Sequence, residues 1–301
     1  MSSSAAVVPD GPLIVGVDGA DRARDAIALG QQLAIDLPGG IEAVYIHTLE
    51  GLDDLMTGKR PHEFEQLVAE DEAAKLSEVR TLVAPMGIEE VQVRRAATPS
   101  EGLYAQVAES KASIVVIGSS ERSGLGKLLP GGTAERLLSA SPVAVAVAPN
   151  GYADREKARE VVGVGFDDSP ESRVAVEWAA DIARRSGASL RLLAVHTLLP
   201  FGGLAAGGDW GTMAVNEVLG SELQSAMETL VKDFESDLTV ESRLLRGGAP
   251  SVLAAQSEEL DLLVLGSRGY GPVKSVLLGS VSSQVIKDAG SPVLIAPRPA
   301  D

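Results

Sequence analysis

The chain has 301 residues, enough for about two domains, and 45% of them are hydrophobic while only 3% are aromatic. This composition excludes a disordered chain and favours helices packed on a parallel sheet over an aromatic-rich β-sandwich. The net charge of −16 argues against a nucleic-acid or anionic membrane surface, and the lack of cysteine excludes disulfides and thiolate metal sites.

The first residues, MSSSAAVVPDG, lack a basic segment followed by a long apolar run. No stretch of the chain approaches the roughly 18 consecutive apolar residues that a membrane helix needs. We therefore expect a cytoplasmic protein without a membrane partner. Any anionic ligand must be held by local donors, because the overall charge repels it.

One sequence pattern occurs twice along the chain. LIVGVDGADRARDAIALGQQLA at residues 13 to 34 parallels VVGVGFDDSPESRVAVEWAADIA at residues 161 to 183. Each copy is typical of an apolar strand that ends in Gly and Asp, followed by a turn and a helix. AVYIHTL corresponds to LLAVHTL, and SPVAVAVAP in the middle of the chain corresponds to SPVLIAP near its end. Such a repeat predicts two similar domains.

The segment NGYADREKARE, residues 150 to 160, is polar and lacks apolar periodicity, so it is interpreted as a linker. We place the boundary near residue 155, which gives domains at 1–154 and 155–301. Continuous apolar runs at 114 to 117 and 262 to 265 predict strands buried on both faces. Their alternation with helices predicts an α/β fold with a doubly wound parallel sheet, in which ligands bind at the carboxyl ends of strands.

The stretch GSRGYGPVKSVLLGSVSSQV, residues 266 to 285, follows one of these strands. Gly266 and Gly269 allow the backbone to turn sharply and to approach a ligand. Gly279 and Ser280 precede a predicted helix, whose first N–H groups and dipole favour an anion. This spacing fits a phosphate chain. From the spacing alone, a glycine-rich turn followed by a serine helix cap is an equal alternative.

The four residues Gly266, Gly269, Gly279 and Ser280 match a G-2x-G-9x-G-[ST] motif. In this the chain resembles the universal stress protein family, whose ATP-binding members carry the motif after the fourth strand of a five-stranded α/β unit. The resemblance covers essentially the whole chain as two tandem units. It implies an adenine nucleotide alpha-hydrolase-like fold, with a five-stranded, mostly parallel sheet and helices on both faces in each unit.

By this resemblance the second domain binds ATP, with or without Mg²⁺, and Asp167 contacts the ribose or the adenine. A carboxylate can accept hydrogen bonds from ribose hydroxyls or an exocyclic amine, although helix capping is an alternative role for this residue. The residues expected to bind the nucleotide in the second domain are Gly165, Phe166, Asp167, Val195, Gly266, Ser267, Arg268, Gly269, Gly279, Ser280, Val281 and Ser282.

The first domain departs from the motif. Glu121 stands where the second glycine is expected, and Gly132 stands where Ser or Thr is expected. A carboxylate near phosphate is unfavourable, although the following segment SGLGK could rebuild a cradle in another register. We therefore expect a weaker or altered nucleotide site. Its residues are expected to be Gly16, Val17, Asp18, Ile46, Gly118, Ser119, Gly124, Gly131, Gly132 and Thr133.

The sequence contains no Walker A lysine, GxSxG elbow, HExxH or CxxC motif, so we predict no catalytic residue and no protein-held metal. His47 and His196, at equivalent strand ends, are interpreted as structural residues. The favoured function is an ATP-binding regulatory module with little turnover, and not an enzyme. A slow ATPase or phosphotransferase on the same scaffold, using Asp167, Asp168 or Glu121, remains an alternative.

A nucleotide-free protein-interaction scaffold is the other alternative, and the altered first domain fits it well. We expect either a homo-oligomer or an intramolecular pseudo-dimer, because the terminal strands SPVAVAVAP and SPVLIAP are too apolar to remain as exposed edges. We also expect a regulatory protein partner of unknown identity and no nucleic-acid partner.

Overall fold

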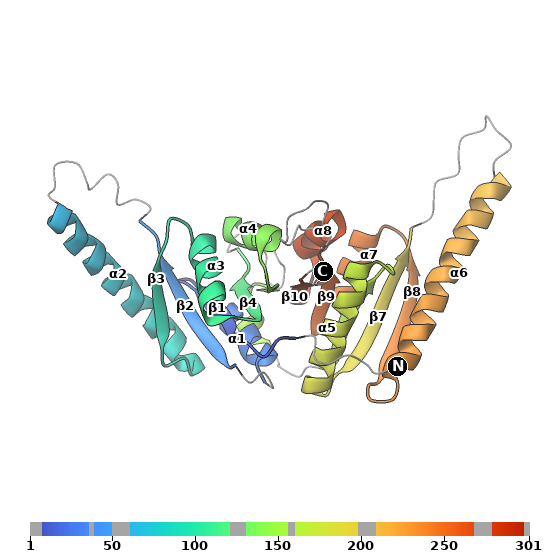
Figure 1. The fold of residues 1–301 in the computed structure, drawn as a ribbon, viewed down its shortest axis with the longest axis horizontal. Coiled ribbons are helices and arrows are strands. Elements are labelled where there is room, and N and C mark those ends of the chain that lie inside the picture. Colours follow the sequence, from blue (N-terminus) through green and yellow to red (C-terminus); the bar gives the residue numbers. More distant parts are fainter. Residues whose placement is uncertain are drawn as a thin grey trace. The chain divides into compact units, whose positions relative to one another are not determined.

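The structure, a computed structural model, describes residues 8–35, 39–49, 61–120, 131–155, 160–197, 209–267 and 279–297, with side chains throughout except at 140 and 209–216. It divides into two compact units, one spanning Pro9–Lys157 and the other Ala158–Asp301, and the described residue Val8 is grouped with the second. In each unit strands alternate with helices (Figure 1).

The described strands of the first unit form a parallel sheet in the order β3-β2-β1-β4-β5. In the register of this sheet, Val15 of β1 lies opposite Ala43 of β2 and Val116 of β4. The elements in chain order are β1 Leu13–Val17, α1 Arg22–Leu33, β2 Ile41–His47, α2 Pro61–Val83, η2 Ala84–Met86, β3 Val91–Arg95, α3 Pro99–Ser110, β4 Ile114–Gly118, α4 Gly132–Ala140, β5 Ala144–Ala148 and η3 Tyr152–Asp154.

The second unit repeats this arrangement, with a parallel sheet in the order β10-β9-β6-β7-β8. Its elements are β6 Val161–Phe166, α5 Pro170–Ser186, β7 Ser189–His196, α6 Asp209–Phe234, β8 Val240–Arg246, α7 Ala249–Ser257, β9 Leu262–Gly266, α8 Ser280–Asp288 and β10 Val293–Ala296. The predicted α/β fold with a doubly wound parallel sheet in each unit is confirmed.

Helices cover both faces of each sheet, as the apolar strands require. In the first unit a glycine of α1, Gly30, lies against Val15, whereas Leu103 of α3 lies against Gly16. Neighbouring residues of a strand point to opposite faces, so α1 and α3 pack on opposite sides of β1. In the second unit Leu253 of α7 lies against Gly165 in the same way that Leu103 lies against Gly16.

Local sequence explains where the helices that follow the central strands begin. Ser169 caps α5, because its hydroxyl accepts a hydrogen bond from the backbone N–H of Ser172, and Pro170 occupies the first helical position. The helix ends at Gly187, whose φ of 68° is readily adopted by glycine. In the first unit, Asp21 occupies the cap position of α1 without a side-chain hydrogen bond.

Part of the polar segment interpreted as a linker folds onto the first unit. The carboxylate of Asp25 in α1, which is only 3% exposed, accepts hydrogen bonds from the N–H groups of Gly151 at 2.9 Å and Ala153 at 2.8 Å. In the second unit Asp261 accepts from Glu160 at 2.8 Å and from Val161 at 2.9 Å. These carboxylates therefore fix the chain on both sides of residues 156–159.

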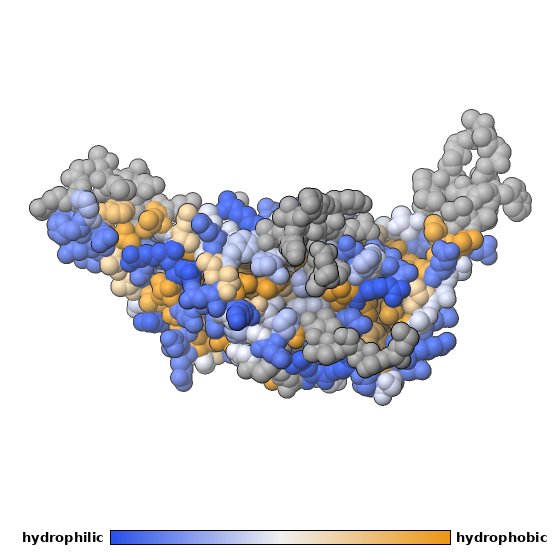
Figure 2. All heavy atoms as spheres, viewed as in Figure 1, coloured by the Kyte–Doolittle hydropathy of each residue, from blue (hydrophilic) through white to orange (hydrophobic). Residues whose placement is uncertain are grey.

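The surface seen in Figure 2 is mainly hydrophilic, in keeping with the acidic composition. Among the described side chains, the large hydrophobic ones that are exposed are Ile35, Leu49, Val218 and Leu219. No helix in the described part of the chain is long and apolar enough to cross a membrane.

Candidate functional site

A cavity lies at the carboxyl end of the central strand in each unit. In both sheets the first strand lies between the second and the fourth, so that successive crossovers leave it in opposite directions. Such a switch point is where open α/β sheets bind their ligands, because the loops separate there. The two cavities therefore occupy the position that the topology favours.

The first pocket has a volume of about 630 Å³ and is formed by strands β1, β2 and β4 with the starts of α1, α3 and α4. It brings together most of the predicted residues: Gly16, Val17, Asp18, Ile46, Gly118, Ser119, Gly131, Gly132 and Thr133. Predicted Gly124 and the substituted Glu121 lie outside the described residues. The pocket also contains residues that the sequence did not single out: Arg22, Val44, Pro99, Leu103, Ile117, Ser120, Ala134 and Glu135.

The second pocket is smaller, at about 260 Å³. Predicted residues that line it are Gly165, Phe166, Asp167, Val195, Gly266, Gly279, Val281 and Ser282, together with the unpredicted Ser169, Glu171, Ser172, Leu193, Thr197, Ala249, Leu253 and Leu265. Ser267 is buried beside Gly266 and Ser280 is exposed at the start of α8, and neither lines the pocket. Arg268 and Gly269 lie outside the described residues.

Glycines at the ends of β4 and β9 are required by packing. A Cβ atom on Gly118 would lie 2.2 Å from the carbonyl oxygen of Arg22, and one on Gly266 would lie 2.6 Å from that of Glu171. Both distances are far inside van der Waals contact with backbone. The glycines therefore let the first helix of each unit approach the fourth strand, which forms one wall of each pocket.

The carboxylates that follow the central strands do not cap the helices after them. Asp18 accepts a hydrogen bond from the N–H of Ala20 at 3.1 Å through Oδ1, while its Oδ2 accepts from Arg22. Asp167 accepts through Oδ1 from both the N–H, at 3.2 Å, and the hydroxyl of Ser169. Each aspartate thus closes a tight turn at the pocket and leaves the cap position of the next helix to another residue.

The two pockets differ in charge at the first turn of the helix after the central strand. Arg22 lines the first pocket, whereas Glu171 occupies the corresponding place in the second. The second unit has its own aspartate–arginine ion pair, Asp168 with Arg173, but neither residue lines its pocket. Asp168 adopts a left-handed φ of 63°. Among the described lining residues, the second pocket therefore has no cation.

The starts of α4 and α8 form the opposite wall of the pockets. Gly131 and Gly279 occupy the cap positions, and neither cap residue makes a side-chain hydrogen bond to its helix. The first N–H groups of these helices therefore have no side-chain acceptor from the cap, and they suit an anion. Ser282 donates its hydroxyl to the carbonyl of Gly266 at 3.1 Å and so ties α8 to β9.

In the first unit a different residue fixes the final helix. The hydroxyl of Tyr104 in α3 donates to the carbonyl of Arg136 in α4 at 2.6 Å. Burial raises the pKa of Tyr104 further above its ordinary value of 10.0, which already keeps the hydroxyl protonated and a donor at neutral pH. Helix α4 of the first pocket is thus anchored to the neighbouring helix α3.

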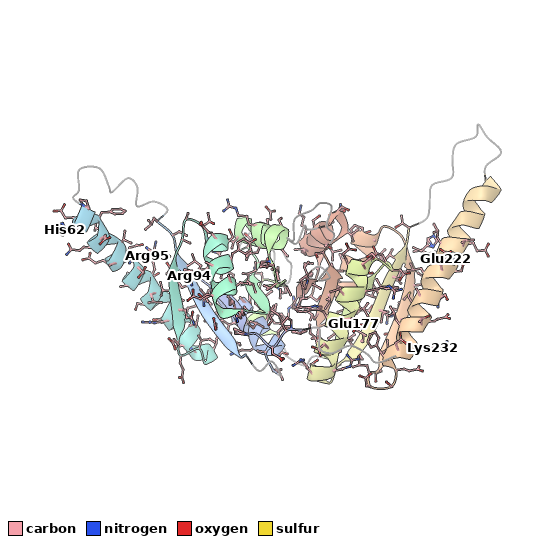
Figure 3. The ribbon with its side chains drawn as sticks, viewed as in Figure 1. His62, Arg94, Arg95, Glu177, Glu222 and Lys232 are labelled. Carbon is pink, nitrogen blue, oxygen red and sulfur yellow. The ribbon has the colours of Figure 1, made fainter. Side chains whose placement is uncertain are left out.

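The histidines lie outside both pockets. His47 is fully buried, with Nε2 3.8 Å from Oδ2 of Asp71, and its neighbour Ile46 is the residue that lines the first pocket. A Cβ atom on Gly220 of α6 would lie 2.9 Å from Nδ1 of His196. His62 is exposed at the start of α2 (Figure 3). Among the described residues no group of three or more His, Asp or Glu side chains could hold a metal ion.

Comparison with known proteins gives the family. The universal stress protein family model matches residues 11–149 and again residues 159–297. The chain belongs to the universal stress protein family. A universal stress protein of Mycolicibacterium smegmatis is 31% identical over 188 residues, which are 62% of this chain and 63% of that protein. One of Mycobacterium tuberculosis is 30% identical over 203 residues, which are 66% of this chain and 68% of that protein.

A solved universal stress protein from Archaeoglobus fulgidus has a TM-score of 0.65 with 20% identity, and the match covers 96% of this chain and 98% of that one. This likeness agrees with the fold and the tandem arrangement of two universal stress protein units. Two solved universal stress proteins about half as long hold adenine nucleotides, one cAMP and one, from Arabidopsis thaliana, AMP. Each is 25% identical over less than half of this chain, with TM-scores of 0.30 and 0.34.

Sequence reasoning missed the pocket residues of this universal stress protein that come from the first helical turns. A recognisable signal was present: α1 and α5 begin within a few residues of the aspartate that ends the central strand, so their first turns must face the same strand ends. The start of the third helix is also part of each pocket, through Pro99 and Leu103 in one unit and Ala249 and Leu253 in the other.

Proposed function

We propose that this universal stress protein binds an adenine nucleotide, foremost ATP, in its second pocket and acts as a nucleotide-dependent regulatory module of the stress response. The observation that carries the proposal is the convergence of Asp167, Gly266 and the start of α8 on one cavity. That cavity offers a carboxylate at one end and a helix N-terminus at another, which are complementary to a nucleoside and to a phosphate respectively.

The phosphate end is supported by the helix itself. Helix α8 runs from Ser280 to Asp288, and its cap residue Gly279 provides no side-chain acceptor for the first N–H groups. Those N–H groups and the helix dipole stabilise an anion even in a protein of net charge −16. Mg²⁺ is proposed only as a counterion that arrives with ATP, bound through the phosphate oxygens.

The nucleoside end is supported by the walls of the pocket. Val195, Leu253 and Leu265 provide apolar surface, and Asp167 provides an acceptor beside them. Binding sites for small molecules are typically apolar with a few well-placed polar groups. Such a wall accommodates the face of a purine, while the carboxylate accepts from a hydroxyl or an amine.

We propose little turnover, because the described residues that line the second pocket include no histidine or lysine and only two carboxylates that could activate water. Its described carboxylates are Asp167 and Glu171, and Oδ1 of Asp167 already accepts two hydrogen bonds from Ser169. Backbone donors that bind ground state and transition state alike do not lower the chemical barrier. We expect hydrolysis far below the enzyme median of about 10 per second. Turnover of several ATP per second, lost in Asp167→Asn, would favour the ATPase alternative.

The assembly and the setting of the protein are also proposals. We propose that the terminal strands SPVAVAVAP and SPVLIAP pair, either within one chain or between chains, and that the protein works in the cytoplasm with a regulatory protein partner. Separately expressed halves should then associate when mixed, as measured by analytical ultracentrifugation. Halves that stay monomeric and soluble would contradict the pairing.

The nucleotide site is tested by blocking the start of α8. In Gly279→Val a branched side chain replaces the hydrogen at the cap, where the pocket is lined by backbone, so ATP affinity should fall by about 100-fold or more. Ser280 lies outside the pocket lining but is exposed in the first turn of α8, so Ser280→Ala removes one candidate phosphate donor and should cost about 5- to 150-fold. The matched control is Ser283→Ala, because this hydroxyl is already engaged as a donor to the carbonyl of Ser280.

Affinity is measured by calorimetry, and the methyl resonances of Leu253 report binding at the second pocket in the intact chain. We expect ATP to shift these resonances in the unaltered protein and in Ser283→Ala. ATP affinity that is unchanged in both Gly279→Val and Ser280→Ala would overturn the proposed site. Circular dichroism and urea unfolding of each variant separate a loss of ligand from a loss of fold.

A further inference from the structure

The first pocket contains an ion pair that has no counterpart among the described residues that line the second pocket. Nε and Nη2 of Arg22 lie 2.6 and 2.5 Å from Oδ2 of Asp18, and both residues line the cavity. The other carboxylate oxygen of Asp18 accepts from the N–H of Ala20. In this arrangement both oxygens of Asp18 are engaged before any ligand arrives.

The ion pair is exposed enough to be exchanged for contacts with a ligand. The side chain of Arg22 is 40% exposed and that of Asp18 is 37% exposed. Exposed pairs of this kind contribute little to stability, because water screens them and two side chains must be held in place. A ligand that offers each partner an equivalent contact can therefore replace the pair.

The chemistry of that ligand follows from the two partners. A guanidinium binds a phosphate group through two parallel N–H donors, and a carboxylate accepts from hydroxyl groups. A ligand with a phosphate and hydroxyls, such as a nucleotide, can satisfy both residues at once. A nucleoside offers hydroxyls to Asp18 but no anion to the guanidinium of Arg22.

Arg22 is the one cation among the described residues that line the first pocket, where the described carboxylates are Asp18 and Glu135. The same cavity is bounded by Gly131 and Gly132 at the start of α4, whose first N–H groups suit an anion. In the second pocket the corresponding first-turn residue is Glu171, which repels an anion. The pair of Asp168 with Arg173 in that unit lies outside the pocket lining.

We propose that Arg22 makes the first pocket selective for phosphorylated nucleotides over nucleosides. The inference rests on the proposed function, because it takes the ligand of this fold to be an adenine compound. It goes beyond that proposal by assigning the preference for nucleotides over nucleosides to one side chain, Arg22, in the first unit. Arg22 is thus a specificity-determining residue, with Asp18 as its partner in the absence of phosphate.

The test uses the full chain with ¹³C-labelled leucine methyl groups, titrated separately with AMP and adenosine. Leu103 lines the first pocket and Leu253 the second, so their methyl resonances report the two sites independently. In Arg22→Gln, the AMP affinity read at Leu103 should fall about 10- to 100-fold, because a charge-assisted contact is lost. Adenosine affinity at Leu103 should rise about 2- to 5-fold, because Asp18 is released from its ion pair.

The matched control is Arg24→Gln on the same helix, because Arg24 pairs with Asp154 at 3.6 Å and does not line the pocket. It should change neither affinity. The reciprocal variant Glu171→Gln should strengthen AMP binding at Leu253 and leave Leu103 unaffected. The opposite signs for AMP and adenosine at Leu103 are the decisive result, since a merely structural role of Arg22 would move both in one direction.

Equal weakening of AMP and adenosine in Arg22→Gln, or an unchanged AMP affinity, would overturn the inference. AMP that shifts Leu253 but never Leu103 in the unaltered protein would also overturn it, while the proposed second site would stand. Absence of any shift at Leu253 with ATP or AMP, by contrast, would count against the proposed function itself. The two failures are therefore read at different methyl groups.

Discussion

The pockets of the two units share their backbone plan and differ in their charge. In both, glycines end the fourth strand, an aspartate follows the central strand, and the final helix begins at a glycine cap. Yet Asp18 is held by an arginine inside its pocket, whereas Asp167 is held by the serine that caps the next helix. The sheet thus fixes where a ligand can lie, and the first helical turn fixes which ligand chemistry is favoured there.

The two pockets can share a backbone and differ in charge because strand-end glycines and first-turn residues have different structural roles. The strand-end glycines are constrained by backbone contacts within the fold, as the close approach of Gly118 to Arg22 and of Gly266 to Glu171 illustrates. Arg22 and Glu171 line the two cavities at corresponding places and carry opposite charges. The repeat can therefore keep its fold while its two sites diverge in charge.

The largest expected effect is on stability, and it concerns the strand-end glycines that the two pockets share. Gly118→Ala and Gly266→Ala should each lower the free energy of unfolding by about 3 kcal/mol, because the new Cβ would overlap a backbone carbonyl that cannot move without displacing α1 or α5. Gly118→Ala should be the more severe, since its overlap is closer. Urea unfolding monitored by circular dichroism measures both.

The control for these substitutions is Gly132→Ala in the first turn of α4. A Cβ atom there has no other atom within 4 Å, among the residues that the structure describes. Alanine should therefore leave stability unchanged or raise it by up to about 1 kcal/mol, through its better helix propensity. Similar losses in Gly118→Ala and Gly132→Ala would show that the close approach to Arg22 is not what requires glycine at residue 118.

The second prediction concerns the carboxylate that holds the end of the first unit. Asp25→Ala should cost about 2 to 4 kcal/mol, because the N–H groups of Gly151 and Ala153 lose their buried acceptor. The control is Asp21→Ala at the start of the same helix, where the side chain makes no capping hydrogen bond. A loss of less than about 0.5 kcal/mol in Asp25→Ala would mean that water replaces the carboxylate.

The same residue predicts a direction of pH dependence. Burial raises the pKa of Asp25 above its ordinary value of 3.8, and the two backbone donors oppose this effect. Between 3.8 and the raised pKa the folded state binds more protons than the unfolded state, so this group's contribution to stability falls as the pH rises through that window. The free energy of unfolding should be measured for the unaltered protein and for Asp25→Asn from pH 3 to 7. Relative to the unaltered protein, Asp25→Asn should become more stable as the pH rises.

The fold and the position of the sites were predictable because they follow from repeated, strongly periodic patterns. Apolar runs such as 262 to 265 specify buried strands, and the topology then brings their carboxyl ends to one edge. For this reason the strand ends could be named as the place of the ligand sites, and the resemblance to the universal stress protein family then assigned Asp18 and Asp167 to them. Their hydrogen-bond partners could not be predicted, because whether a strand-end aspartate caps a helix or closes a tight turn depends on a choice between nearby N–H groups.

The contribution of Arg22 escaped sequence reasoning for a related reason. Arg22 and Arg24 lie on the same short stretch of α1, yet one faces the pocket and the other pairs with Asp154. Only the phase of the helix relative to the sheet distinguishes them, and that phase depends on packing between α1 and the strands. Similarly, the sequence assigned residues 150–160 to a linker, because composition does not reveal that Asp25 binds Gly151 and Ala153.

The third prediction sharpens the asymmetry between the pockets. The first unit has Glu121 and Gly132 in place of the motif's glycine and hydroxyl, and Ala134 where Ser282 ties α8 to β9. We expect ATP to bind the first pocket about 10- to 100-fold more weakly than the second, with Arg22 offsetting part of the loss. Titration of leucine methyl groups with ATP measures both sites, and equal half-saturation at Leu103 and Leu253 would contradict the asymmetry.

The smallest expected effect separates the two ways in which the aspartates are held. Ser169 caps α5 and also donates to Asp167, so Ser169→Ala should cost about 1 kcal/mol of stability. The corresponding change in the first unit, Asp21→Ala, should cost close to nothing, because Asp21 makes no capping hydrogen bond.

The Ser169→Ala variant also loses one of the two Ser169 donors to Oδ1 of Asp167. ATP affinity read at Leu253 should therefore change in this variant, whereas Asp21→Ala should leave the affinity read at Leu103 unaltered. Equal stability losses in the two variants would mean that the cap at Ser169 does not distinguish the units, and that the contrast between the pockets rests on Arg22 and Glu171 alone.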